Sequence, residues 1–321
     1  MATIPQCEDP WRVRPRGGGG EELLAQKIEL IQDIIPLDAQ VGVLPKKTVP
    51  DALHQAMFGQ EPTAAQLEHT YAILDAAKVP NLLEMLEDSG LEYRCLFTGE
   101  AQDDLGQVAP WIVRLEEGSS FTRNLFTRGD APWCLWDAEA GIYVRSIAAL
   151  DEVWRHFRKF TRVQDNTGKW YLFRYWEPDS VVFANHITQL TDASAGTSRL
   201  LGRLTENHRL ISVFDGTAYI LSSRQGVKPG NDKISVRFFE CAYAAKIIRN
   251  QGGALPRGRA EFEILHLLLI NKMLDANIFR WAKQISNVQG GSWIMKKIVE
   301  HCMISSLVKR DALRYLASRL S

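Results

Sequence analysis

The run KWYLFRYWEP at residues 169–178, called the aromatic run below, constrains the fold of this chain more than any other segment. Five of its ten residues are aromatic, and Arg174 stands among them. Successive side chains of a strand point to opposite faces, so a strand here would carry bulky groups on both and would need cover on both sides. A buried guanidinium also needs a partner, because an unpaired buried charge is costly. We expect Asp75 or Glu177 to be that partner.

Short apolar runs alternate with amphipathic segments over residues 65–228. The strand-like runs are HTYAILDAA, YRCLF, VAPWIVRL, PWCLWDA, the aromatic run, RLISVFDG and TAYILSS. Helices are expected for NLLEMLEDSG, with Asn81 as its cap, for residues 120–127 and 146–161, and for SVVFANHITQL. Asp215 and Gly216 predict a hairpin between the last two strands. This alternation predicts an α/β lobe with a mixed sheet.

The two flanking regions differ from residues 65–228 in composition and in apolar periodicity. Residues 1–64 carry prolines and the glycines of GGGG, which predicts a flexible arm, and helical apolar spacing at 21–35 predicts an N-terminal helix. Residues 229–321 show only helical patterns, so we expect an all-helical C-terminal lobe. That lobe is basic: from residue 232 onward there are fifteen Lys/Arg and seven Asp/Glu, in a chain whose totals are 38 and 38. An acidic partner surface is one explanation, and a solvated basic face is the other.

Cysteine usage and the N-terminal sequence bear on compartment and metals. The five cysteines are far apart and form no C-x-x-C pair, which predicts free thiols and no zinc site. MATIPQCEDPWRVRPRGGGG has charges and prolines where a signal peptide has an apolar segment, and no run is long enough to span a membrane. We therefore expect a cytoplasmic protein without membrane contact.

Known catalytic motifs are absent from the sequence: it has no G-x-S-x-G, H-E-x-x-H, Walker or G-x-G-x-x-G pattern. Asp75 ends a predicted strand, where α/β enzymes place catalytic carboxylates, but a cap or a core ion-pair partner is the favoured role. A hydrolase or transferase using Asp75, His156 and Glu177 remains the alternative, and it requires these three residues to share one cleft. A nucleic-acid module is disfavoured, because the aromatic run lacks the glycine and basic flank of RNA-binding strands.

Five strings in order carry a family resemblance: TYAILDAA, LEYRCLFTGE, APWIVRL, WRHFRKFTRV and WYLFRYWEPDSV. Together, over about residues 69–190, they resemble the adaptor, or effector-chaperone, family of bacterial type VI secretion. The motif positions in this chain are Tyr71, Asp75, Pro110, His156, Arg158, Arg174 and Pro178. Glu177 stands where the family has aspartate, and Lys159 where it has arginine, so charge type is kept at both departures.

The resemblance implies a non-catalytic, cofactor-free cytoplasmic protein. Such a protein would bind a secreted toxic effector and help to load it onto the VgrG spike. Whether Tyr71, Asp75, His156, Arg158, Arg174 and Glu177 touch a partner or hold the lobe together stays open at this point. The helical lobe is a natural place for the choice of cargo. Its Leu/Ile-rich residues 264–274 either form the core of that lobe, which is favoured, or offer a groove to an effector helix.

Overall fold

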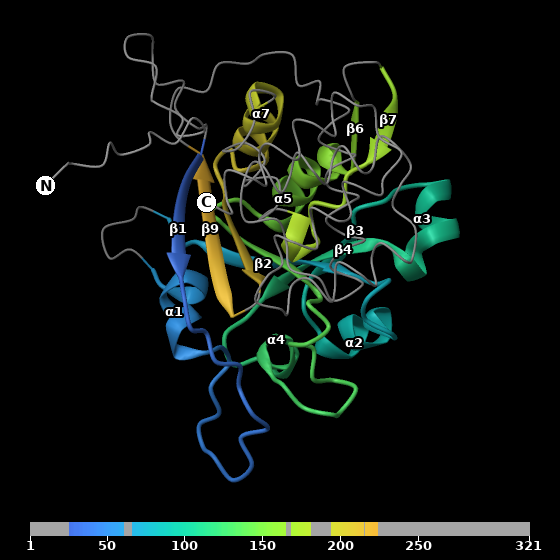
Figure 1. Ribbon diagram of the computed structural model, residues 1–321. Coiled ribbons are helices and arrows are strands. Elements are labelled where there is room, and N and C mark those ends of the chain that lie inside the picture. The colour runs from blue at the N-terminus through green and yellow to red at the C-terminus, as the bar shows by residue number, and fades with distance from the viewer. Residues whose placement is uncertain (1–25, 61–65, 165–167, 181–193, 215, 224–321) are drawn as a thin grey trace, which may run out of the picture.

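The structure is a computed structural model, and it describes residues 26–60, 66–164, 168–180, 194–214 and 216–223 (Figure 1). The strands are β1 (Gln26–Ile31), β2 (His69–Asp75), β3 (Tyr93–Cys95), β4 (Pro110–Leu115), β5 (Gly141–Ser146), β6 (Arg162–Gln164), β7 (Trp170–Leu172), β8 (Arg209–Phe214) and β9 (Thr217–Ser223). The helices are α1 (Asp51–Phe58), α2 (Leu82–Ser89), α3 (Glu100–Leu105), α4 (Ser120–Phe126), α5 (Leu150–Phe157) and α7 (Ser194–Leu204), with the 3₁₀ turns η1 (Gly106–Val108) and η2 (Arg158–Phe160).

Seven strands form one sheet in the order β1-β9-β8-β5-β2-β4-β3. Every pairing between these strands is antiparallel, so the prediction of a mixed sheet is wrong. The order explains why. The connection containing α2 joins β2 to β3, which are separated by β4, and the connection containing α4 joins β4 to β5, which are separated by β2. The two strands that each connection joins are thus parallel to one another, and the strand inserted between them makes every neighbouring pair antiparallel.

The sheet is the middle layer of three. Along β2, Tyr71 and Ile73 belong to one apolar cluster, and Ala72 and Leu74 belong to the other. This is the period-two alternation of a strand buried on both faces. Helices α5 and α7 cover the first face, and α1, α2 and α4 cover the second (Figure 1). The α/β class of residues 65–228 is thus confirmed for its described part, as layers on an antiparallel sheet.

Three element predictions are wrong. Residues of the expected N-terminal helix at 21–35 form the edge strand β1, which pairs with β9 from Lys27↔Ser222 to Ile31↔Ala218. Residues 51–58, within the region predicted to be a flexible arm, form α1. PWCLWDA forms turns, and the strand lies just after it as β5. For β1 and β5, pairing with β9 and with β2 and β8 decides the outcome over local pattern.

The aromatic run also departs from expectation. Its first residues form β7, which pairs with β6 in a separate two-stranded sheet, and Trp170 and Leu172 are exposed. The chain then leaves the strand, and the turn that follows carries Phe173, Tyr175 and Trp176 into the core. The expected strand covered on both sides is therefore wrong, because the rings are buried from a turn and not from a sheet.

Other predictions hold. Strands β2, β3 and β4, helices α2, α4 and α5, and the β8–β9 hairpin lie where the sequence places them. Asn81 precedes α2 in a left-handed conformation but makes no side-chain cap, contrary to its predicted role. Residues 1–25 of the predicted arm, all but the first residue of the helix predicted for SVVFANHITQL, and the helical lobe at 229–321 lie outside the described residues. Within the described residues, none of the helices is long and apolar enough to cross a membrane.

Candidate functional site

Asp75, Arg174 and Glu177 form an ion-pair cluster, called the Arg174 network below. The guanidinium Nη2 of Arg174 donates a hydrogen bond to Asp75 Oδ2, and its Nε lies 2.7 Å from Glu177 Oε1. Both carboxylates are buried, whereas Arg174 is half-buried. Both partners predicted for this arginine are therefore confirmed. Two carboxylates thus contact one guanidinium.

The backbone holds each member of the network in place. Asp75 is the last residue of β2, where its N–H donates to Ala140 O at 2.8 Å and its Oδ1 accepts the Ala77 N–H at 3.1 Å. Arg174 follows β7, and the Glu177 N–H closes a turn on Arg174 O at 3.1 Å. The Arg174 network therefore joins the end of a central strand to the turn that brings the aromatic run into the core.

A second hydrogen bond fixes that turn to the sheet. The Ser212 hydroxyl of β8 donates to Pro178 O at 2.7 Å, and the serine is fully buried. Tyr175 of the same turn donates its hydroxyl to Phe157 O of α5 at 3.0 Å. The turn is thus connected to β2, β8 and α5. These contacts indicate that the Arg174 network has a structural role.

Tyr71 lies apart from the Arg174 network, in the middle of β2. Its side chain is buried, and its hydroxyl donates to Ala148 O at 2.6 Å. Burial raises the pKa of the Tyr71 phenol. Its position and its single acceptor indicate that it anchors the connection between β5 and α5.

His156 also lies elsewhere, against a second histidine. The rings of His156 and His208 are 4.4 Å apart between centroids, and His156 Nε2 donates to Leu204 O at 3.1 Å. His208 Nδ1 lies 3.0 Å from the Ser146 hydroxyl. Burial lowers the pKa of both rings, that of His208 to about 4. Both imidazoles are therefore neutral at pH 7.

Arg158 belongs to a stacked group around Trp154. The guanidinium carbons of Arg94 and Arg158 lie 3.6 and 4.6 Å from the Trp154 ring centroid, a cation–π arrangement. Arg158 Nη2 also donates to the Thr98 hydroxyl at 3.0 Å. Arg158 thus links α5 and η2 to the loop after β3. The contribution of Arg94 was not foreseen, because nothing in the sequence places β3 beside α5.

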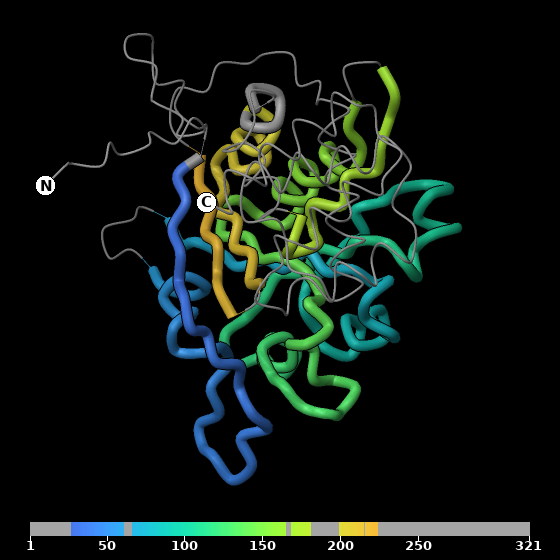
Figure 2. Tube along the Cα trace, viewed as in Figure 1, coloured from blue at the N-terminus to red at the C-terminus, as the bar shows by residue number. Residues whose placement is uncertain are grey.

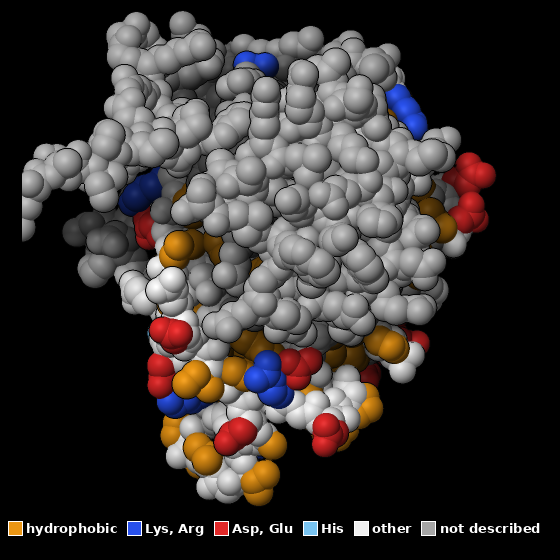
Figure 3. All heavy atoms as spheres, viewed as in Figure 1, with side chains coloured by type: hydrophobic (Ala, Val, Ile, Leu, Met, Phe, Trp, Pro, Cys, Tyr) orange, Lys and Arg blue, Asp and Glu red, His pale blue; other side chains and the backbone are white. Residues whose placement is uncertain are grey.

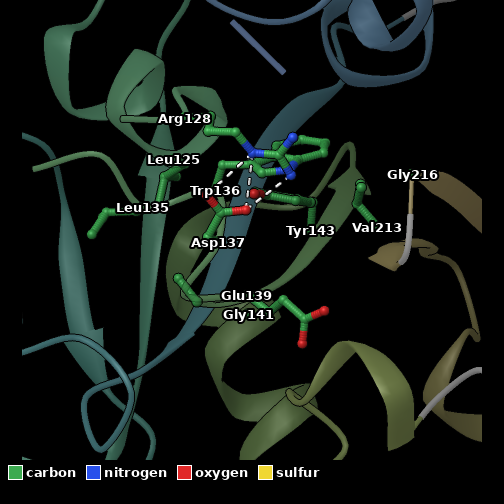
Figure 4. Close-up of a pocket in the computed structure, with 11 residues that line it drawn as sticks. Leu125, Arg128, Leu135, Trp136, Asp137, Glu139, Gly141, Tyr143, Val213 and Gly216 are labelled. Atoms are coloured by element: carbon green, nitrogen blue, oxygen red, sulfur yellow. Dashed lines mark hydrogen bonds and ion pairs between the residues drawn. The ribbon is translucent and has the colours of Figure 1, made fainter. Parts of the chain in front are cut away.

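A pocket of about 190 Å³ opens between the loop after α4, strand β5 and the β8–β9 hairpin (Figure 4). Arg128 and Asp137 are ion-paired on its wall, with Nη2 and Oδ1 2.9 Å apart, and Tyr143 lies beside them. None of the six site residues predicted from the sequence lines this pocket. Within the described residues, no group of three His, Cys, Asp or Glu side chains could hold a metal ion.

The structure therefore divides the predicted site. It brings Asp75, Arg174 and Glu177 together, and it gives Tyr71, His156 and Arg158 separate partners inside the fold. The described contacts of His156 are Leu204, His208, Phe157 and Phe160, and neither carboxylate is among them. The structure thus joins Asp75 and Glu177 through Arg174 and places His156 against Leu204 and His208.

Residues 70–194 match a family model described as "Domain of unknown function (DUF4123)". This domain is associated with type VI secretion effector adaptors. A search of curated proteins and a search of solved structures found no match. The matched segment runs from β2 to the first residue of α7 and contains all six predicted site residues. The centre of the described fold, with the Arg174 network, is thus similar to this adaptor-associated domain.

Proposed function

We propose that this chain is a non-catalytic adaptor of type VI secretion. It binds a secreted toxic effector in the cytoplasm and assists its loading onto the VgrG spike. The observation that carries the proposal is the match of residues 70–194 to the adaptor-associated domain, over the same segment in which five motifs stand in order.

The motif residues contact partners inside the fold, which supports the view that other surfaces of the protein bind the effector and the spike. Asp75 and Glu177 are both engaged by Arg174, and Tyr71 and His156 donate to backbone carbonyls within the fold. Side chains with these partners stabilise the lobe. Recognition of the effector and of the spike then belongs to exposed residues outside the motif series.

The experiment is co-expression of the full chain with the products of its neighbouring genes, followed by affinity purification of this chain. We expect an effector and a spike protein to co-purify, and the effector to be less soluble when this chain is omitted. Absence of any such partner would contradict the proposal. Turnover of a small molecule by the purified chain, abolished in Asp75→Asn, would favour the hydrolase or transferase alternative.

A further inference from the structure

The connection between β1 and α1 exposes an unusual amount of apolar surface. Ile35, Val41 and Leu44 are 78%, 88% and 90% exposed, and Val43 is also exposed. We call residues 38–47 the finger. It projects from the lower end of the molecule (Figure 2), and hydrophobic side chains are visible on that end in the space-filling view (Figure 3). Contiguous exposed apolar side chains on a folded protein mark interaction surfaces.

The base of the finger is held by a side-chain clamp. Gln40 is buried, its Nε2 donates to Lys47 O at 3.0 Å, and its Oε1 accepts the Lys47 N–H at 2.7 Å. A single amide thus bridges the two ends of the loop. Asp38 Oδ1 accepts the Gln40 N–H at 2.8 Å and completes the closure. The apolar tip is therefore presented on a fixed base.

The backbone conformation of the finger also indicates that its base is fixed. Gln40 has a φ of 46° and Gly42 a φ of 75°, so two left-handed residues reverse the chain. This conformation is ordinary for glycine but uncommon for glutamine. Residues held in sparsely populated backbone regions gather at functional sites. Gln40 is kept there by both hydrogen bonds of its side chain.

The finger stands on a second segment, and together they are acidic. Leu37 N donates to Phe126 O and Arg128 N donates to Leu37 O, at 2.9 and 2.8 Å, and Arg123 Nε donates to Lys47 O at 3.2 Å. Residues 33–51 and 116–139 contain eight Asp/Glu and four Lys/Arg, a net charge of −4. An acidic surround repels anionic lipid and nucleic acid, and it attracts basic partners.

From this geometry we infer that the finger is a docking site for a basic amphipathic segment of the partner protein. The apolar face of that segment would cover Val41, Val43 and Leu44, and its Lys/Arg side chains would face the acidic surround. That the partner is the effector cargo rests on the proposed function. The surface and the chemistry of its occupant rest on the exposure, the clamp and the charge.

The test uses the full chain and two 18-residue helical peptides, one with leucine and lysine faces and one with leucine and glutamate faces. Fluorescence anisotropy should show that the lysine peptide binds at least about tenfold more tightly than the glutamate peptide, and that added salt weakens its binding. Val41→Ser with Leu44→Ser should weaken binding of the lysine peptide by about tenfold or more, because the buried apolar area is lost. Leu172→Ser, which changes a 52% exposed leucine on β7, is the matched control and should leave binding unchanged.

A second variant distinguishes binding by a pre-organised finger from non-specific hydrophobic binding. Gln40→Ala keeps every apolar side chain of the tip but removes the clamp, so binding should weaken by about three- to tenfold through the cost of ordering the loop. Thermal unfolding of each variant identifies any loss of folding. Equal binding of the two peptides, or binding that the double variant does not change, overturns the inference. A dimer that Val41→Ser with Leu44→Ser dissociates, or finger-dependent flotation on anionic vesicles, also overturns it in favour of a second copy or a membrane.

Co-purification with the effector distinguishes this inference from the proposed function. If the wild-type chain co-purifies with an effector and the double variant does so equally, the finger is not the docking site, although the adaptor function stands. If the wild-type chain captures no effector, the proposed function fails, and the peptide measurements alone decide the inference.

Discussion

At the scale of residues, two arginines show how far local sequence can locate a buried charge. Arg174 was singled out by its aromatic neighbours and is 32% exposed in its side chain, whereas Arg145 of β5 is 1% exposed. Arg145 Nη1 donates to the Thr70 hydroxyl at 2.9 Å, and its Nη2 pairs with Glu68 at 3.0 Å. The motif GIYVRS gave no signal, because burial of Arg145 follows from the central place of β5 in the sheet.

Asp75→Asn tests whether the Arg174 network stabilises the fold. The change removes one charge of a buried pair but keeps the shape of the side chain. Arg174 is partly exposed and retains Glu177, so we expect a loss of about 1–3 kcal/mol in the free energy of unfolding, less than for a fully buried pair. Urea denaturation measures this loss.

Asp151→Asn is the matched control, because Asp151 forms an exposed ion pair with Arg94 at 2.5 Å. Exposed pairs contribute little, and we expect a change of about 0.5 kcal/mol or less. Wild-type stability of Asp75→Asn would show that the network has another role than holding the turn of the aromatic run.

The His156–His208 pair should make stability depend on pH. Burial lowers the pKa of His208 to about 4, while the unfolded chain titrates near the ordinary value of about 6.5. Between these values the unfolded state binds more protons, so stability is present above about pH 6.5 and is lost as the pH falls toward 4. His208 should account for a loss of about 2 kcal/mol between pH 7.5 and pH 5.

The groups facing the pair do not reverse this direction. Lys159 and Arg203 lower the pKa of His156 further, and Glu206 opposes them. Unfolding by urea at pH 7.5 and pH 5 should show a smaller difference for His208→Gln than for the wild-type chain. His54→Gln is the control, because His54 is exposed and pairs with Glu117 at the surface. An unchanged pH dependence in His208→Gln would contradict the prediction.

At the scale of elements, the sequence pattern predicts the correct structure for segments whose own apolar periodicity matches the face that they bury. The helix predicted over residues 146–161 is present as α5 and buries Val153, Trp154 and Phe157, and β2 and the β8–β9 hairpin follow their patterns. It failed for β1 and for β7, whose partners lie far along the chain or outside the main sheet. The candidate site divides in the same way. The charges that pair with Arg174 could be predicted, but the partners of His156 and Arg158 depend on helix placement.

Gly141 illustrates a requirement that strand pairing places on one residue. A Cβ at this position would lie 2.0 Å from Ile73 O, in the pairing of β5 with the central strand β2. Gly141→Ala must therefore displace backbone, and we expect a loss of about 3 kcal/mol or more, or insoluble protein. Gly106→Ala is the control, since no atom lies within 4 Å of its added Cβ and its φ is −53°. Soluble yield and the thermal midpoint measure both, and equal values for the two variants would contradict the expected clash.

At the scale of the whole described fold, the two apolar layers share one sheet. The same strands supply both clusters, and α1 lies on one face while α7 lies on the other (Figure 1). The sequence predicted the layers through alternation but not the antiparallel order, which depends on connections that bypass a neighbouring strand. Because both layers pack against the same strands, loss of packing in one layer also destabilises the strands that the other layer covers.

Leu53→Ala in α1 and Leu201→Ala in α7 test this coupling between layers. Both leucines are fully buried, so each change should cost about 2–5 kcal/mol through lost contacts and the cavity left behind. Because β2, β5 and β8 contribute to both clusters, each variant should lower the midpoint of the same unfolding transition. Far-UV and near-UV circular dichroism during urea denaturation should give coincident curves that shift together. Two separate transitions, each moved by one variant alone, would mean that the layers unfold independently although they share the strands.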